Sequence, residues 1–267
     1  AQPSRSVASQ IRHRKSVTSL NPEDLTNLRD AITKMLAISD DRGFEHWAGI
    51  HGLPLPMYCH HGDLLFLPWH RAYLYFFEQY LMDQVAAARL PWWDWTDQKG
   101  VPAAFAVAQL DGGGANPLAS APISGIPDSQ FKAEAVPKTT TTFRRTKAPS
   151  TLPSPALVNQ ILSLSSFDDF SMQVEDQLHN RVHVWTGGTM GLIPLAAYDP
   201  LFWAHHTMVD RLWWLWQLRH PGAGPDPSML HTALAPFPNI TVAQTLDVTS
   251  LGYDYAVSAD STTPPQP

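Results

Sequence analysis

The distribution of histidine constrains this chain more than any other feature of its sequence. Eight of its twelve histidines lie in three short windows that are otherwise rich in Leu, Phe and Trp. The eight are His51, His60, His61, His70, His179, His183, His205 and His206. Buried polar groups need partners, so the fold must satisfy these imidazoles together. Imidazole is the commonest side-chain ligand of transition metals, and two groups of three predict a pair of metal sites with room for a further ligand.

The second group starts from two histidines on one helix face. His179 and His183 are four residues apart, so they point the same way on a helix. A third ligand must come from His205 or His206. Because these two residues are adjacent on a helix, their side chains point about 100° apart. Only one of that pair should therefore face the metal. Asp210 lies one turn after His206 and could orient this helix face or a ligand nitrogen.

The first group combines a loop with a helix. His70 opens a strongly apolar helix and His61 lies in the loop before it, while the third donor is His46, His51 or His60. Only one cysteine is present, so a thiolate zinc set is excluded. All-imidazole sites between facing helices suit copper, with zinc as the competitor.

The apolar pattern predicts a mainly α fold, an antiparallel helix bundle around the metal centre with long loops and little sheet. Asn21 and Pro22 mark the start of the first helix, whose apolar face continues to Leu36. The other expected helices run from near Pro68 to the late eighties, over 167–184 and over 200–218. Residues 97–156, dense in Gly, Pro, Thr and Ser, are expected to form a long surface loop.

Composition indicates one domain over residues 1–267. A hydrophobic fraction of 44% supports one sizeable core, and a net charge of −6 argues against nucleic acid as a partner. No apolar run reaches the roughly 20 residues that span a bilayer, so no membrane is expected. The chain starts without Met or an apolar leader, so either a signal peptide has been removed or none existed. Secretion is the expectation, and Asn239 would then be an N-glycosylation site.

Two long segments resemble a known family. The first runs from His61 (HGDLLFLPWHR) on to Glu78, and the second from Asp199 to Arg211 (DPLFWAHHTMVDR). Both closely resemble the copper motifs of the type-3 dicopper proteins, which are tyrosinases, catechol oxidases and molluscan-type haemocyanins. The segment from Pro91 to Trp95 (PWWDW) is similar to a further family segment. The resemblance covers about residues 12–255, followed by a frayed C-terminal tail.

The ends of this region also resemble the family. Tyr253-Asp-Tyr255 is similar to its Tyr-x-Tyr motif, and Arg14 to the arginine that pairs with that motif. The family's C-terminal shielding domain is missing from the sequence, which suggests an open, mature form.

The resemblance implies two copper ions and O2 as co-substrate. The implied ligands are His51, His61 and His70 for the first copper, and His179, His183 and His206 for the second. His205 is then a buried residue that either supports a ligand from behind or packs against the site. The resemblance also implies a thioether bond between Cys59 and His61. The implied activity is oxidation of o-diphenols (catechols) to o-quinones, with o-hydroxylation of monophenols as a further possibility.

Residues beside the ligands would decide between these two activities. In the family an Asn in the place of Asn180 works with an upstream acid to hold a water that deprotonates monophenols. That acid corresponds to Asp176, with Glu175 beside it, although both could be solvated charges. Val184 is neutral and offers no cation for acidic substrates. Ile193 resembles the residue that gates the copper centre and leaves access open.

Three other functions stay open. They are an o-aminophenol-type oxidase with the same site, a non-catalytic haemocyanin-like O2 carrier, and a dinuclear zinc hydrolase. The expected partners are small phenolic substrates and O2, and the chain is expected to be a monomer or weak oligomer.

Overall fold

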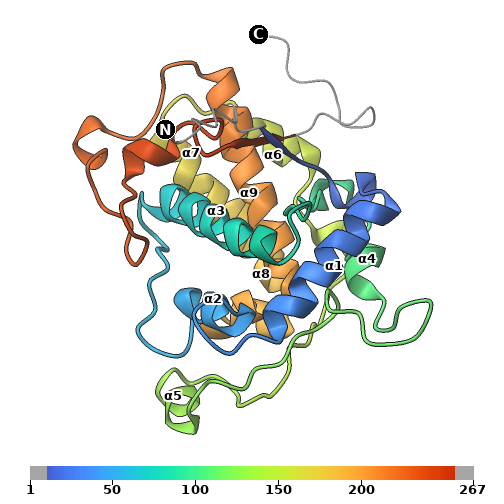
Figure 1. The fold of residues 1–267 in the computed structure, drawn as a ribbon. Helices are drawn as coiled ribbons and strands as arrows, with labels where there is room; N and C mark the ends of the chain where they lie inside the picture. Colours follow the sequence, from blue (N-terminus) through green and yellow to red (C-terminus); the bar gives the residue numbers. More distant parts are fainter. Residues whose placement is uncertain (1–10, 256–267) are drawn as a thin grey trace, which may run out of the picture.

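Two long helices, α3 (Phe66–Gln84) and α9 (Pro200–Arg219), lie at the centre of the fold. The computed structural model describes residues 11–255, so the expected frayed tail lies outside the described part of the chain. Almost every side of α9 is buried, as expected for a helix that is apolar all round. Other helices surround this pair, with α6 and α7 toward the top of the view and α1, α2 and α8 toward the bottom (Figure 1). The mainly α architecture is as predicted.

The remaining elements are shorter. The α-helices are α1 (Pro22–Leu36), α2 (Phe44–His51), α4 (Ala103–Ala106), α5 (Asp128–Ala133), α6 (Pro155–Leu162), α7 (Phe167–Gln173) and α8 (Asn180–Thr186). Short 3-10 helices are η1 (Val17–Ser19), η2 (Trp95–Asp97), η3 (Pro149–Thr151), η5 (Gly188–Gly191), η6 (Ile193–Tyr198), η7 (Pro227–Met229) and η8 (Val242–Thr245). A π-helix, η4, spans Val174–His179. The strands are β1 (Arg12–Arg14) and β2 (Tyr253–Tyr255).

The start of α1 follows the predicted capping. The Asn21 side chain accepts from Asp24 N at 2.8 Å, and the Asp24 carboxylate accepts from Asn21 N at 3.1 Å. This reciprocal capping box satisfies two backbone donors that the first turn leaves free. The helix then ends at Leu36, as expected.

The helix expected from near Pro68 to the late eighties is displaced toward the N-terminus. It begins at Phe66, because a proline is tolerated within the first turn. It ends at Gln84, because Val85 is extended (φ −144°, ψ 106°).

The helix expected over 167–184 is interrupted. It consists of α7, the π-helix η4 and α8, and the π-helix bonds each N–H to the carbonyl five residues back. The wider turn changes which side chains share a face just before His179. π-Turns of this kind are frequent at functional sites.

The region 97–156 is not one continuous loop. It contains α4, α5 and η3 and leads into α6, whose Ser154 side chain caps Leu157 N at 3.2 Å. The short helix α2 was not predicted either. Its sequence, FEHWAGIH, holds a glycine and has no polar face, so no amphipathic pattern marks it.

The two short strands pair in parallel, with Arg14 opposite Tyr255. The Arg14 guanidinium lies 3.7 Å from the centre of the Tyr253 ring, and Nη1 donates to Tyr255 Oη at 3.2 Å. The predicted pairing of Arg14 with the Tyr-x-Tyr motif is therefore confirmed, as is the small amount of sheet.

Arg14 also belongs to a buried ionic network between α3 and α9. It donates to Glu78 at 3.0 Å and to Asp210 at 3.2 Å, while Arg71 donates to Asp210 Oδ1. Burial would raise the pKa of Asp210, but the guanidiniums of Arg71 and Arg14 hold it below its ordinary value. The Asp210 carboxylate thus stays charged inside the core.

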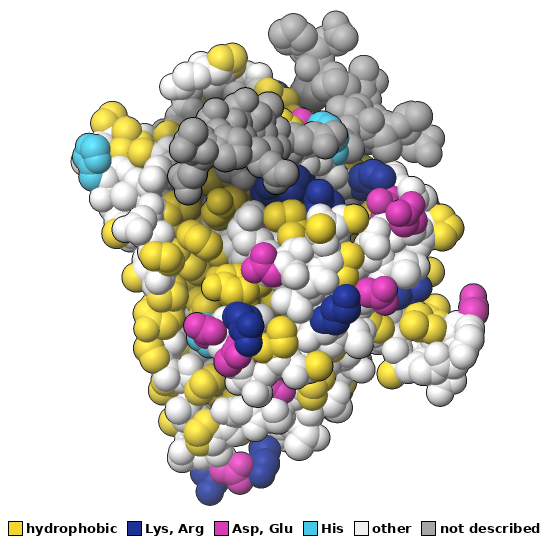
Figure 2. Space-filling model, viewed as in Figure 1, with side chains coloured by type: hydrophobic (Ala, Val, Ile, Leu, Met, Phe, Trp, Pro, Cys, Tyr) yellow, Lys and Arg dark blue, Asp and Glu magenta, His cyan; other side chains and the backbone are white. Residues whose placement is uncertain are grey.

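The structure tests only part of what the sequence predicts about the surface. Figure 2 shows hydrophobic side chains gathered along the left of this view, while Lys, Arg, Asp and Glu are dispersed. Within residues 11–255, the helices are too short or too polar to cross a membrane. Asn239 is exposed, and its glycosylation, like secretion and the oligomeric state, stays a prediction.

Candidate metal centre

Three elements bring the first histidine group together. His51 ends α2, His61 lies in the following loop and His70 is in the second turn of α3. The ring centroids lie 5.3 Å apart for His51 and His61, 5.3 Å for His61 and His70, and 5.5 Å for His51 and His70. We call this nearly equilateral group site A. Only His61 is partly exposed.

A close backbone approach fixes His51. The next residue, Gly52, lies so near η6 that an added Cβ would be 2.2 Å from Pro194 O. Leu53 N donates to the same Pro194 oxygen at 2.9 Å. Only glycine fits between α2 and η6, so this position sets where α2 ends and where His51 points.

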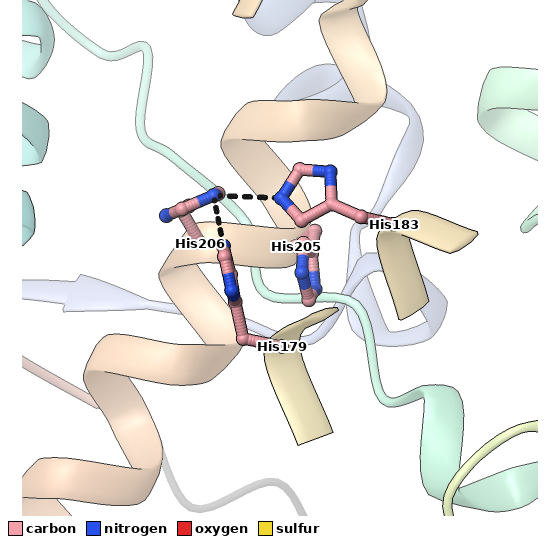
Figure 3. Close-up of side chains that lie close together, drawn as sticks. All are labelled: His179, His183, His205 and His206. Carbon is pink, nitrogen blue, oxygen red and sulfur yellow. Dashed lines mark hydrogen bonds between the residues drawn. The ribbon is translucent and has the colours of Figure 1, made fainter. Parts of the chain in front are cut away.

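The second group comes from the π-helix, α8 and α9. Figure 3 shows His179 and His183 pointing toward His206, and the Nε2 of His206 is 3.2 Å from each of their Nε2 atoms. We call these three residues site B. His179 and His206 are buried and His183 is partly exposed.

Sites A and B adjoin each other. The rings of His70 and His206 stack at 4.7 Å, and those of His61 and His179 at 5.7 Å. The Phe202 ring stacks on His206 at 3.9 Å and meets His51 edge-on at 4.8 Å, so it closes one side of both sites. The arrangement suits two metal ions held side by side.

Hydrogen bonds orient several imidazoles. The Nδ1–H groups of His70 and His183 donate to the backbone oxygens of Phe66 (2.8 Å) and Met190 (2.7 Å). His179 Nδ1 donates to Asn180 Oδ1 at 3.0 Å. Each bond leaves an Nε2 lone pair facing the centre, which is how proteins orient metal-ligating histidines.

Unpartnered nitrogens indicate that a metal fits. In sites A and B, several buried nitrogens lack a hydrogen-bond partner, namely both in His51, Nε2 in His70 and Nδ1 in His206. In site B, the unprotonated Nε2 atoms of His179 and His183 both face Nε2 of His206. A single proton on His206 could form a hydrogen bond to only one of these two lone pairs. Nitrogens about 2.0–2.1 Å from one ion at a tetrahedral angle lie about 3.3 Å apart, close to the 3.2 Å found here.

Burial keeps these imidazoles neutral. It is the main cause that lowers the pKa of His61 and His183 to about 4, and it also lowers the pKa of the four other histidines in sites A and B well below its ordinary value. Neutral imidazole is the form that binds metals. In the described part of the chain, both potential metal-binding groups consist of histidine alone. A dinuclear zinc hydrolase would normally use bridging carboxylates, so copper fits this donor set better.

Three other histidines are candidate ligands by their positions in the sequence. His46 is exposed, and His60 Nδ1 lies 2.9 Å from Asp63 Oδ2 at the surface. His205 is buried and lies within reach of the site B nitrogens, but its ring stacks on that of His179 instead of pointing at His206 (Figure 3).

The solvent-facing side of the centre lies at His61 and His183. Val184 and Ile193 beside it are 55% and 51% exposed, so neither side chain is enclosed by residues 11–255. Asn180 is also exposed. We call these three residues, with His61 and His183, the mouth.

The acid beside the mouth is Glu175. Its side chain is buried, and Oε1 accepts from Gly62 N at 2.7 Å, so it bridges site B's helix to the residue after His61. Burial is the main cause that raises the pKa of Glu175. Asp176, the acid favoured from the sequence, is exposed and bonds the neighbouring Gln177. The π-helix accounts for this change, because it places a different residue on the inner face.

Comparisons with known proteins place these features in one family. The family model described as "Common central domain of tyrosinase" matches residues 41–219. A tyrosinase from Streptomyces glaucescens is 33% identical over 71% of this chain and 78% of that protein. Haemocyanin units G and H from Sepia officinalis are 32% identical over 76% of this chain but 37% of that protein. A functional unit of octopus haemocyanin has a TM-score of 0.77 at 31% identity, over 91% of this chain and 68% of the other.

Metal counting tests the two sites separately. We expect His183→Ala to bind one copper ion fewer per chain than the unaltered protein, because site B loses one of three donors. His46→Ala, outside both groups, should bind as much copper as the unaltered protein. Elemental analysis after copper loading and desalting gives both values. Unchanged copper in His183→Ala, or a loss in His46→Ala, would contradict the assignment.

Proposed function

The chain belongs to the tyrosinase family, and on that premise we propose that it is a copper-dependent oxidase that converts o-diphenols to o-quinones with O2. The family binds two copper ions that work with O2. The observation that carries the proposal is the pair of adjoining three-histidine sites, with a mouth that residues 11–255 leave exposed.

In this proposal the copper ions are held by sites A and B. His51, His61 and His70 would hold one ion, and His179, His183 and His206 the other. When bound, the two ions supply O2 binding and accept the two electrons that each diphenol gives up. The chain's part is to hold six neutral nitrogens in place and to keep water from the rear of the centre.

Several side chains would guide the substrate. Phe202 closes the apolar side opposite the mouth, so a phenol ring must approach between His61 and His183. Val184 and Ile193 offer apolar contacts there without blocking the approach. Glu175, with its raised pKa and an Oε2 that no residue in 11–255 hydrogen-bonds, is placed to accept the proton of a phenol through a water.

The main alternative is an O2 carrier, since haemocyanins are about as similar in sequence as tyrosinases. The exposure of Val184 and Ile193 at the mouth within residues 11–255 favours an oxidase, because a phenol needs wider access than O2 does.

Diphenol oxidation tests the proposal directly. With copper-loaded protein, 4-methylcatechol and air, we expect quinone absorbance together with O2 uptake, two diphenols being oxidised for each O2 reduced to water. His183→Ala and the metal-free protein are the controls. Reversible O2 binding without quinone would identify a carrier instead. Much faster turnover of o-aminophenol than of the diphenol would favour the aminophenol oxidase.

Monophenol hydroxylation is proposed as a second activity that depends on Glu175. We expect Glu175→Gln to lower the rate on tyramine by about a hundredfold, the scale of a lost general base, with much less effect on 4-methylcatechol. In the unaltered protein, the tyramine rate should fall as pH drops through the raised pKa of Glu175, because the protonated acid cannot accept a proton. Asp176→Asn is the matched control, since its side chain faces solvent. Equal losses on both substrates, or the loss appearing in Asp176→Asn, would sink this role.

We also propose the thioether between Cys59 and His61. Cys59 is partly buried, and burial raises the pKa of its thiol to about 12. Forming one C–S bond removes the thiol hydrogen and one ring hydrogen of His61, a two-electron oxidation for which O2 is the acceptor. After exposure to copper and O2, the peptide should be lighter by two hydrogens and resist alkylation. A peptide that keeps both hydrogens and is alkylated would contradict the bond.

A further inference from the structure

The PWWDW segment reaches the metal centre through one hydrogen bond. Trp95 and His205 are both fully buried, and Trp95 Nε1 donates to His205 Nδ1 at 3.2 Å. The opposite nitrogen, His205 Nε2, is buried without a hydrogen-bond partner. Neither residue has a role in the proposed reaction.

This bond determines which nitrogen of His205 carries the proton. An indole N–H is only a donor, so the Nδ1 that receives it must offer a lone pair. A neutral imidazole has one N–H, which must then be on Nε2. A protonated ring nitrogen has no lone pair to give a metal.

His205 otherwise has what a ligand needs. It lies in the same histidine group as His179, His183 and His206, with one nitrogen of each within 4.8 Å of the others. Its ring stacks on His179 at 5.4 Å and meets His183 edge-on at 4.8 Å. With the proton on Nδ1 instead, a modest rotation would let Nε2 compete for the site B metal.

We propose that Trp95 is a positioning residue that holds His205 as the Nε2–H tautomer and so keeps it from becoming a fourth ligand at site B. The position left open is the one that O2 or a substrate must occupy. This inference rests on the proposed ligand set but not on the proposed reaction, since an O2 carrier would need the same open position.

The backbone holds the pair in place. Trp93 N donates to Ala204 O at 3.0 Å, which fixes the PWWDW segment against α9 one residue before His205. The Asp94 side chain accepts from Thr96 N at 3.1 Å and caps η2, where Trp95 is the first residue. Trp93 meets the His205 ring edge-on at 6.4 Å but does not donate to it.

The tautomer can be measured in the unaltered protein. In metal-free or copper(I)-loaded protein labelled with ¹⁵N-histidine, two-bond ¹H–¹⁵N correlations identify the protonated nitrogen of each ring, and His205→Phe assigns the His205 signals. We expect His205 to carry its proton on Nε2. A proton on Nδ1 would overturn the proposal whatever the variants do.

A variant series tests the consequence for the metal. In copper(II)-loaded Trp95→Phe we expect azide to bind roughly tenfold to a hundredfold more weakly, the usual scale for losing a partner behind a metal site, because His205 fills the open position. Trp95→Phe combined with His205→Phe should restore azide binding. Trp93→Phe is the matched control, since it removes an indole beside His205 without removing the bond.

The outcomes separate this role from general packing. Weaker azide binding in Trp93→Phe as well, or no rescue in the double variant, would mean that the tryptophans only pack the core. Azide binding in Trp95→Phe equal to that of the unaltered protein would also overturn the proposal. If Trp95→Phe does not fold, the tautomer measurement alone decides.

Discussion

The metal centre depends on the buried ion pairs that the Asp210 carboxylate forms with Arg71 and Arg14. Arg71 and Arg14 both donate to it, and Glu78 takes the other side of Arg14, so the network joins α3, α9 and the N-terminal strand. Arg71 directly follows His70, and Asp210 is one turn after His206. The ion pair therefore fixes the two helices that give one histidine to each site. Removing one member would leave an unpaired buried charge, which typically costs about 3–5 kcal/mol.

The two sites are built in different ways. Site B takes His179 and His183 from neighbouring turns, so local helix geometry already aligns them. Site A gathers its histidines from the end of α2, a loop and α3, and it needs the glycine at Gly52 and the Glu175–Gly62 bond to hold that loop. The mouth lies between the loop that carries His61 in site A and the helix that carries His183 in site B.

Sequence reasoning predicted what depends on local pattern. The long helices α1, α3 and α9 follow from caps and apolar periodicity, whereas the pairing of Arg14 with Tyr255 follows from the resemblance to the family. The π-helix before His179 could not be predicted, because one extra residue in a turn leaves no compositional mark, and this made Asp176 look better placed than Glu175. The Trp95–His205 bond joins residues far apart in the chain. A motif can mark Trp95 as unusual, but only the fold shows which nitrogen it faces.

The burial of the imidazoles also makes the metal-free chain sensitive to acid. Burial holds the imidazoles of both sites, and that of His205, neutral well below the pKa of about 6.5 that they regain on unfolding. As pH falls from that value toward 4, the unfolded chain takes up protons that the folded chain cannot, so the free energy of unfolding decreases. Denaturant titrations of metal-free protein across this range measure the effect. Bound metal would occupy the same nitrogen lone pairs and oppose this decrease in the free energy of unfolding. Copper uptake and stability in an acidic environment are therefore linked through one set of nitrogens.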